Sequence, residues 1–164
     1  MEILIYPHPK LREKAGKVHR FDAHLKKTVE EMIKLMREKN GVGLAAPQVG
    51  ISKRIVVIEL QPKENEQISP IPLTILINPK ITKLSPEKEV AKEGCLSLPE
   101  KEVPVERAVK CTILAQDLEG NRIKLKPQGL FARICQHEID HLEGVLIIDK
   151  ASKLPADAGA WRNL

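Results

Sequence analysis

Gln136-His137-Glu138-Ile139-Asp140-His141 places two histidines four residues apart, with a glutamate directly after the first. Residues four apart lie one turn apart on the same face of an α-helix. Two imidazoles at this spacing can bind one metal ion, while the glutamate reaches the water that the metal activates. The alternative is a pair of core histidines with Glu138 on the helix surface. Burying both imidazoles without a partner would be costly, so the pattern favours a catalytic metal site.

The residues around this motif predict the helix that carries it, over residues 128–143. Leu130 and Ile134 precede the two histidines at steps of four and three residues, so that all four share one stripe. Gly144 stands where a left-handed residue ends a helix. The apolar face is widened by Phe131, Cys135 and Leu142. We therefore expect a buried helix whose histidines point inward.

Further from the motif, the apolar spacing predicts a second helix and several strands. Residues 22–40 repeat apolar side chains at helical spacing, and Gly41 follows as a stop. Residues 54–60 are typical of a buried strand, and residues 61–72 of an exposed loop. Further strands are expected over residues 73–77, 109–115 and 122–126, the last two joined by a turn at residues 117–121.

Length and composition indicate one domain with an ordinary core. The chain has 164 residues, of which 42% are hydrophobic and only four are aromatic. So few aromatic residues argue against stacking on nucleic-acid bases. The net charge is +5, but the 27 basic residues alternate with 22 acidic ones, which is typical of a solvated surface. A small positive net charge is compatible with a weak ribosome contact. We do not expect sequence-specific nucleic-acid binding, because the basic residues are not clustered.

The chain is expected to be cytoplasmic and to have no membrane segment. Its first residues lack the basic and apolar regions of a secretory signal, and no apolar run is long enough to span a bilayer. The chain has three cysteines, and such a small, odd number does not suit a disulfide framework. They are better explained as reduced thiols, one of which binds the metal.

A catalytic site of this kind needs a third protein ligand and one open position. In the metzincin extension of the motif a third histidine follows, but Ile147 stands at that position here. A downstream glutamate is also excluded, because none follows Glu143; Asp149 and Asp157 are the only acidic residues there. The sequence therefore favours a third ligand that lies upstream of the helix.

The upstream candidate is Cys95, which lies in a short segment bounded by Gly94 and Pro99. Cys111 lies in a strand-like run and is better explained as a small core residue. Cys135 lies on the helix itself, and it stays open as the alternative third ligand.

Three segments of the chain together resemble, in order and spacing, the motifs of the peptide deformylases. They are Gly41-Val42-Gly43-Leu44-Ala45-Ala46-Pro47-Gln48, Glu93-Gly94-Cys95-Leu96-Ser97 and Gln136-His137-Glu138-Ile139-Asp140-His141. The resemblance implies an enzyme that removes the formyl group from the formyl-methionine of new polypeptides and releases formate. It also implies an α+β fold, with antiparallel sheets packed around the helix that carries the His-Glu-x-x-His motif. The catalytic domain would span residues 1–150, followed by a C-terminal tail over residues 151–164.

The resemblance assigns a role to each matching residue. Cys95, His137 and His141 look like the metal ligands, and Glu138 like the carboxylate that transfers protons. Gln48, through its amide, and Leu96, through its backbone N–H, resemble the donors that face the developing oxyanion. Ferrous iron is the metal that the resemblance favours, with zinc and nickel as alternatives.

The substrate contacts follow from the same resemblance. Val42 and Gly43 resemble backbone that pairs with the peptide, and Gly94 its counterpart on the other side. A methionine pocket would be lined by Val42, Glu93, Leu130, Ile134 and the edge of His137. Two residues depart from the family pattern: Glu102 replaces a basic residue in several members, and Arg133 occupies a position that is often apolar. Either could alter the preference beyond formyl-methionine.

Two other functions compete with this interpretation. A different metallopeptidase could use the same metal and Glu138 to cleave internal peptide bonds. The second competitor is a binding module with a structural metal site that has four protein ligands. Such sites are usually rich in thiolates, whereas this sequence offers one cysteine beside the two histidines.

Overall fold

The computed structural model describes residues 1–64 and 66–151. The first long helix, α1 (Ala23–Glu38), confirms the helix predicted over residues 22–40. Asp22 caps its start, because the carboxylate accepts a hydrogen bond from the Leu25 amide at 3.0 Å. Its apolar face is buried along its whole length, and its opposite face carries the charged residues.

The second long helix, α2 (Gly129–Leu142), confirms the helix predicted over residues 128–143. Gln128 and Glu143 are its two capping residues. Gly144 has a φ of 71°, so this glycine supplies the left-handed conformation that ends the helix. His137 is 9% exposed and His141 only 1%, and both histidines therefore point inward as expected.

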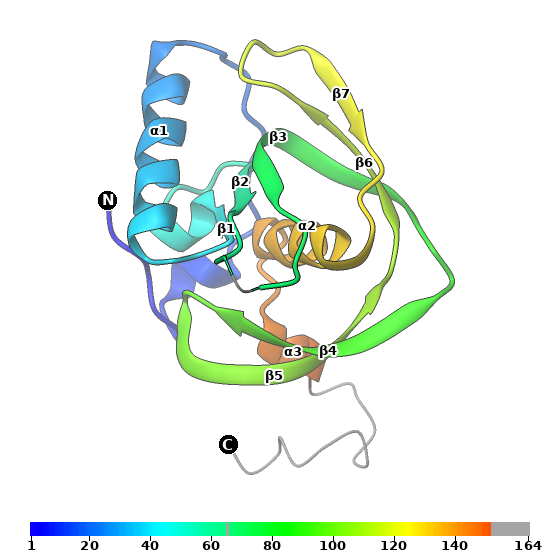
Figure 1. Cartoon of the computed structure of the whole chain (residues 1–164). Coiled ribbons are helices and arrows are strands. Elements are labelled where there is room, and N and C mark those ends of the chain that lie inside the picture. The colour runs from blue at the N-terminus through cyan, green and yellow to red at the C-terminus, as the bar shows by residue number, and fades with distance from the viewer. Residues whose placement is uncertain (65, 152–164) are drawn as a thin grey trace.

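A five-stranded antiparallel sheet surrounds one side of α2 (Figure 1). Its order is β1-β2-β3-β6-β7, so that β1 and β7 form the two edges. The strands are β1 (Gly43–Ala45), β2 (Ile55–Leu60), β3 (Ile71–Leu84), β6 (Cys111–Gln116) and β7 (Arg122–Leu125).

Strand β2 is buried on both faces, because a helix packs on each. Val56 and Ile58 belong to the core that includes α2, whereas Ile55 and Val57 belong to the core that includes α1. Figure 1 shows α1 on the far side of β1 and β2 from α2. The alternation of side chains along a strand therefore divides the interior into two layers.

A second sheet contains two strands, β4 (Lys88–Cys95) and β5 (Leu98–Ala108). The two strands are joined by a turn at Leu96 and Ser97, which Cys95 immediately precedes. Val103 and Val105 of β5 pack with the short helix α3 (Ile147–Ala151) in a third core. This arrangement confirms the expected α+β class with antiparallel sheets.

The sequence prediction of the strands was incomplete. The strand expected over residues 54–60 and the hairpin of residues 109–115 and 122–126 are confirmed, each within two residues. By contrast, the strand expected over residues 73–77 is only a part of β3, which starts inside the expected loop. Strands β1, β4 and β5 were not predicted.

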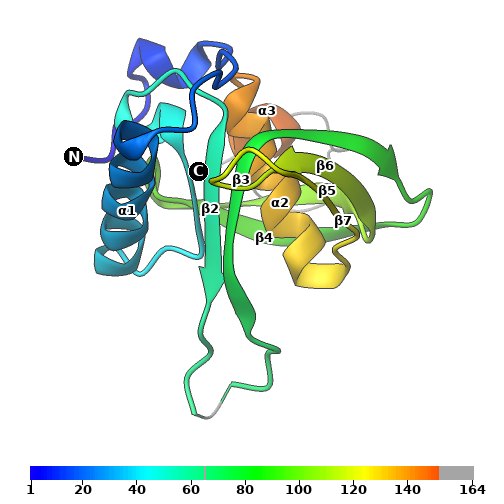
Figure 2. The same ribbon diagram turned by 90° about the horizontal axis from the view of Figure 1, so that it is seen from above.

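The N-terminal segment connects two parts of the chain that are distant in sequence. The Leu4 amide donates to the Gln48 carbonyl at 2.7 Å, and the Tyr6 amide donates to the Ser97 carbonyl at 2.9 Å. Figure 2 shows this segment on one side of the molecule. No helix within the described residues is long and apolar enough to cross a membrane.

The expected C-terminal tail falls almost entirely outside the described residues. Ala151 itself ends α3 and is 1% exposed, whereas residues 152–164 are not described. The division into a catalytic domain over residues 1–150 and a tail over residues 151–164 stays a prediction.

Candidate active site

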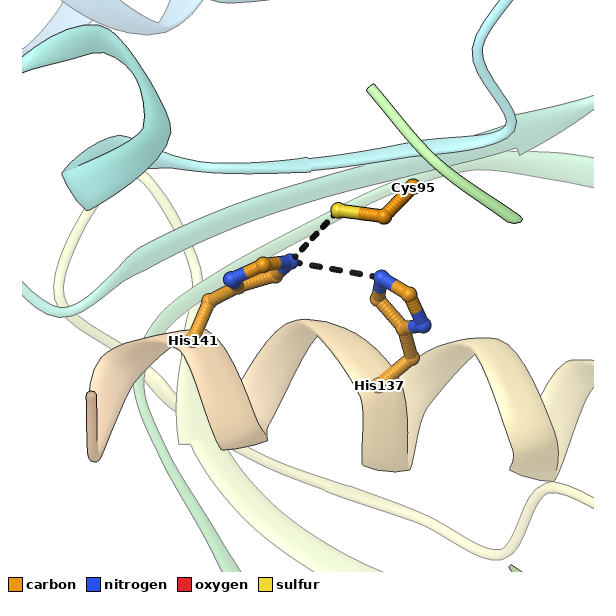
Figure 3. A group of neighbouring side chains, drawn as sticks. All are labelled: Cys95, His137 and His141. Atoms are coloured by element: carbon orange, nitrogen blue, oxygen red, sulfur yellow. Dashed lines mark hydrogen bonds between the residues drawn. The ribbon is translucent and has the colours of Figure 1, made fainter. Parts of the chain in front are cut away.

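Three side chains that can bind a metal converge beside α2 (Figure 3). His141 Nε2 lies 3.2 Å from His137 Nε2 and 3.3 Å from Cys95 Sγ. The three donor atoms all lie within 4.8 Å of one another. The histidines come from successive turns of α2, and Cys95 comes from the end of β4.

The spacing of these donor atoms fits one metal ion. Two nitrogens at ~2.0–2.1 Å from a tetrahedral centre are about 3.3 Å apart, close to the separation of the two Nε2 atoms. The thiolate and the imidazoles are also donors that iron, nickel and zinc accept. Within the described residues, the structure therefore brings Cys95 to the two histidines.

Cys135, the alternative third ligand, lies elsewhere. It is fully buried in the apolar core with Cys111. Burial raises the pKa of both thiols, and that of Cys111 is raised to about 11. Such thiols are held in the protonated form, which does not bind a metal.

Glu138 is buried on the site's side of the helix instead of lying on the surface. It is 4% exposed, and its carboxylate rests against Gly43. A methyl group on Gly43 would lie 2.8 Å from Glu138 Cδ, so this glycine makes room for the carboxylate. Burial raises the pKa of Glu138 to about 7, a value suited to accepting and returning a proton near neutral pH.

The side chain of Gln48 is fixed in one orientation. Gln48 lies in a 3₁₀ turn after β1, at Ala46–Val49, and is 1% exposed. Its Oε1 accepts from the Ala45 amide at 2.9 Å, and its Nε2 donates to Ser97 Oγ at 3.2 Å. Because the Ala45 N–H can only donate, the Gln48 amide nitrogen must point the other way, and it lies 3.6 Å from Cys95 Sγ.

Glu93 contacts His137 directly. Its Oε2 lies 2.9 Å from His137 Nδ1. A carboxylate in this position fixes the ring so that Nε2 faces a metal. Burial would raise the pKa of Glu93, but hydrogen bonds from His137 and Arg107 lower it to about 2. Glu93 is therefore held as a carboxylate.

Two buried arginines complete the partners of Glu93. Arg107 donates to both carboxylate oxygens at 2.9 Å and also contacts Asp140. Arg133 donates to Glu93 at 2.7 Å and to the Val105 carbonyl at 2.9 Å. The guanidinium of Arg133, a departure from the family pattern, thus joins α2 to the second sheet.

The roles of Ser97 and Arg107 were missed by the sequence analysis. Ser97 was part of a quoted segment but received no role, although it is fully buried. Arg107 lies in the chain beside Ala108 and Val109. A cation next to apolar residues could have indicated a buried ion pair, but nothing in the sequence indicates its partner.

A cleft of about 520 Å³ opens beside the three donor atoms. It is lined by every residue that we predicted to act on the substrate, together with Arg133 and Glu102, while His141 lies behind the lining. The predicted residues in the lining are Val42, Gly43, Gln48, Glu93, Gly94, Leu96, Leu130, Ile134 and Glu138. Val42 and Leu130 are 39% and 43% exposed, and Ile134 is buried.

A buried glutamate beside two imidazoles and a thiolate, at the base of a peptide-sized cleft, defines a metal-dependent hydrolase. Comparison with known sequences shows which kind of metal-dependent hydrolase this is. The sequence model of one family, polypeptide deformylase, matches residues 1–156. The chain belongs to this family.

Named relatives and solved structures agree with this assignment. The chain is 48% identical to the peptide deformylase of Dictyoglomus thermophilum over 87% of both chains. It is 45% identical to that of Thermotoga maritima, over 92% of this chain and 86% of the relative. A crystal structure of the Thermotoga maritima enzyme has a TM-score of 0.82 and covers 91% of this chain and 95% of its own.

A third comparison is with a class I type b peptide deformylase from Acinetobacter baumannii, bound to Met-Ala-Ser. This structure has a TM-score of 0.87 at 33% identity, and covers 92% of this chain and 97% of its own. The chain is accordingly a hydrolase that removes the N-formyl group from newly synthesised polypeptides.

Proposed function

We propose that Cys95, His137 and His141 hold one divalent metal ion for this deformylation. The observation that carries the proposal is the convergence of their donor atoms within 4.8 Å, beside the buried Glu138. When bound, a divalent metal lowers the pKa of a water and stabilises negative charge on a carbonyl oxygen.

The remaining roles belong to residues of the chain. Glu138 accepts the proton of the attacking water, and it returns that proton to the amine that leaves. The Gln48 amide and the Leu96 backbone N–H donate to the oxygen that becomes negative when the formyl carbon is attacked. Glu93 keeps His137 in the orientation and tautomer that leave Nε2 free to bind.

The substrate is proposed to be the formyl-methionyl end of a nascent chain. Met-Ala-Ser, which is bound to the Acinetobacter baumannii relative, begins with the methionine that deformylation would expose. Among the described residues, β1 pairs with β2 alone, so its other edge can pair with a peptide through Val42 and Gly43. Gly94 faces the cleft from β4, and Val42, Leu130 and Ile134 supply apolar surface for methionine.

Release of formate tests the function. Formyl-Met-Ala-Ser should yield formate and Met-Ala-Ser when it is mixed with metal-loaded protein. Casein in a parallel reaction tests the competing metallopeptidase, which would produce internal cleavage instead. Formate without casein cleavage supports the proposal, whereas cleavage of casein alone would replace it.

Ferrous iron is the metal that we propose, with zinc and nickel as alternatives. We also propose a cytoplasmic location, because formylated nascent chains arise where translation takes place. A weak ribosome contact is proposed on the net charge of +5.

A further inference from the structure

A second cavity lies away from the active site. Its volume is about 640 Å³, and it shares no lining residue with the catalytic cleft. Four lysines line it, namely Lys83, Lys110, Lys124 and Lys126. The lining includes no aspartate or glutamate.

The strands that form this groove carry only positive charges. Strands β3, β6 and β7 contain no acidic residue. They carry Lys80, Lys83, Arg122 and Lys124, all of which are exposed. Basic and acidic residues alternate along the chain as a whole, but these three strands carry basic residues without acidic ones.

The pairing register places much of this charge on the face of the sheet opposite α2. Ile113 packs in the same core as α2 residues, so its neighbours Thr112 and Leu114 point outward. Thr112 pairs with Lys83, and Leu114 pairs with Lys124. Cross-strand partners share a face, and both lysines therefore point away from the catalytic helix.

The four groove lysines have no ion-pair partner among residues 1–64 and 66–151. Charged residues on an edge strand can simply prevent strands of two molecules from pairing. This explanation suits Lys124 on β7, but Lys83 lies on an interior strand and Lys110 precedes β6. Ammonium groups gathered around one groove repel one another unless an anion separates them.

The geometry points to the groove as a binding site for the phosphate backbone of RNA. Each phosphate of a nucleic-acid backbone carries one negative charge, so neighbouring phosphates can pair with the four lysines around the groove. No aromatic residue lines the groove, so bases cannot stack there and binding is independent of sequence. The inference rests on the proposed ribosome contact for its biological role, and it assigns that contact to a surface.

Fluorescence anisotropy with a labelled RNA duplex of about 20 base pairs tests the site. If four phosphates are contacted, the slope of log K against log salt should be about −3 to −4. Affinity should then fall by roughly 100-fold between ~50 and ~200 mM KCl. A variant with Gln at Lys83, Lys110, Lys124 and Lys126 should bind at least about 30-fold more weakly at the lower salt concentration.

A matched control removes the same charge elsewhere, with Gln at Lys17, Lys27, Lys34 and Lys63, which are all exposed. The control should bind RNA within about threefold of the unaltered protein. Equal losses in the two variants would overturn the inference, because net charge alone would explain the binding. Full competition by inorganic phosphate or by polyglutamate at the same charge concentration would also overturn it. Both variants should release formate from formyl-Met-Ala-Ser normally, so a failure of RNA binding is distinguishable from a failure of the proposed function.

Discussion

The Glu138 carboxylate lies in the space that a side chain at position 43 would fill, so Gly43 is needed beside it. Gly43→Ala should push the Glu138 carboxylate away, because the new methyl group would lie 2.9 Å from Glu138 Cγ. We expect kcat to fall by about 10²-fold, as is typical for a misplaced catalytic group, while metal content stays the same. Gly16→Ala is the control, because its methyl group would meet only the Ser52 carbonyl, at an ordinary 3.7 Å. Normal turnover by Gly43→Ala would show that the carboxylate has room to move.

Glu138→Ala separates metal binding from proton transfer. The variant should keep its metal and lose activity by about 10²–10⁴-fold, because both proton transfers depend on this carboxylate.

The two cysteine variants test the third metal ligand. Cys95→Ala should lose metal, whereas Cys135→Ala should keep it, since Cys135 lies in the apolar core. Metal analysis of the three variants checks these assignments, and the reverse pattern for the two cysteines would move the third ligand.

Ser97 should act through Gln48, to which it is hydrogen bonded. Gln48→Ala should lower kcat by roughly 10²–10³-fold if its amide stabilises the oxyanion. Ser97→Ala should lower kcat less, by about tenfold, because only the orientation of the amide is loosened. The double variant should be no slower than Gln48→Ala alone. Additive losses in kcat would show that the two residues act separately.

The sequence predicted which residues meet at the candidate site better than it predicted the residues that support them. His137, Glu138 and His141 follow from spacing within one helix, because helical geometry is regular. Arg107, by contrast, reaches Glu93 across two paired strands. Such a contact depends on strand register, which the sequence of one chain does not display.

At the level of elements, Gly144 joins the end of α2 to the N-terminal segment. A methyl group there would collide with the Arg12 carbonyl, and the φ of 71° already disfavours any side chain. Gly129 has a φ of 56° but open space around it, so Gly129→Ala measures the backbone cost alone. That variant should lose about 1–2 kcal/mol of stability, and Gly144→Ala should lose at least about twice as much. Calorimetry would give both values, and equal losses would mean that the Arg12 contact relaxes.

The strands that the sequence did not predict have compositions that are unusual for strands. Strand β5 contains Pro99 and Pro104, and in β4 half of the eight residues are charged and most are exposed. Proline is accepted in edge strands, and in a sheet of two strands both are edges. The long helices were predicted well because their buried faces repeat without interruption.

For the molecule as a whole, the identity of the metal should control both rate and lifetime. Protein loaded anaerobically with ferrous iron or nickel should release formate faster than the zinc form. The iron form should lose activity in air, because ferrous iron beside the Cys95 thiolate favours oxidation of both. Assays at verified metal content check this expectation. Equal rates for zinc and iron, with no loss in air, would make zinc the natural metal.

The N-terminal segment also gives the molecule a built-in reporter. Tyr6 is the only tyrosine of the chain, and its amide is hydrogen bonded to the Ser97 carbonyl in the turn that follows Cys95. The Arg12 guanidinium lies 5.5 Å from its ring centre. Protein grown with 3-fluorotyrosine would therefore give one fluorine resonance, from a residue whose backbone is bonded to the turn after Cys95, without any mutation. A shift of that resonance on adding metal or product peptide would show that a change at the turn reaches the N-terminal segment in solution.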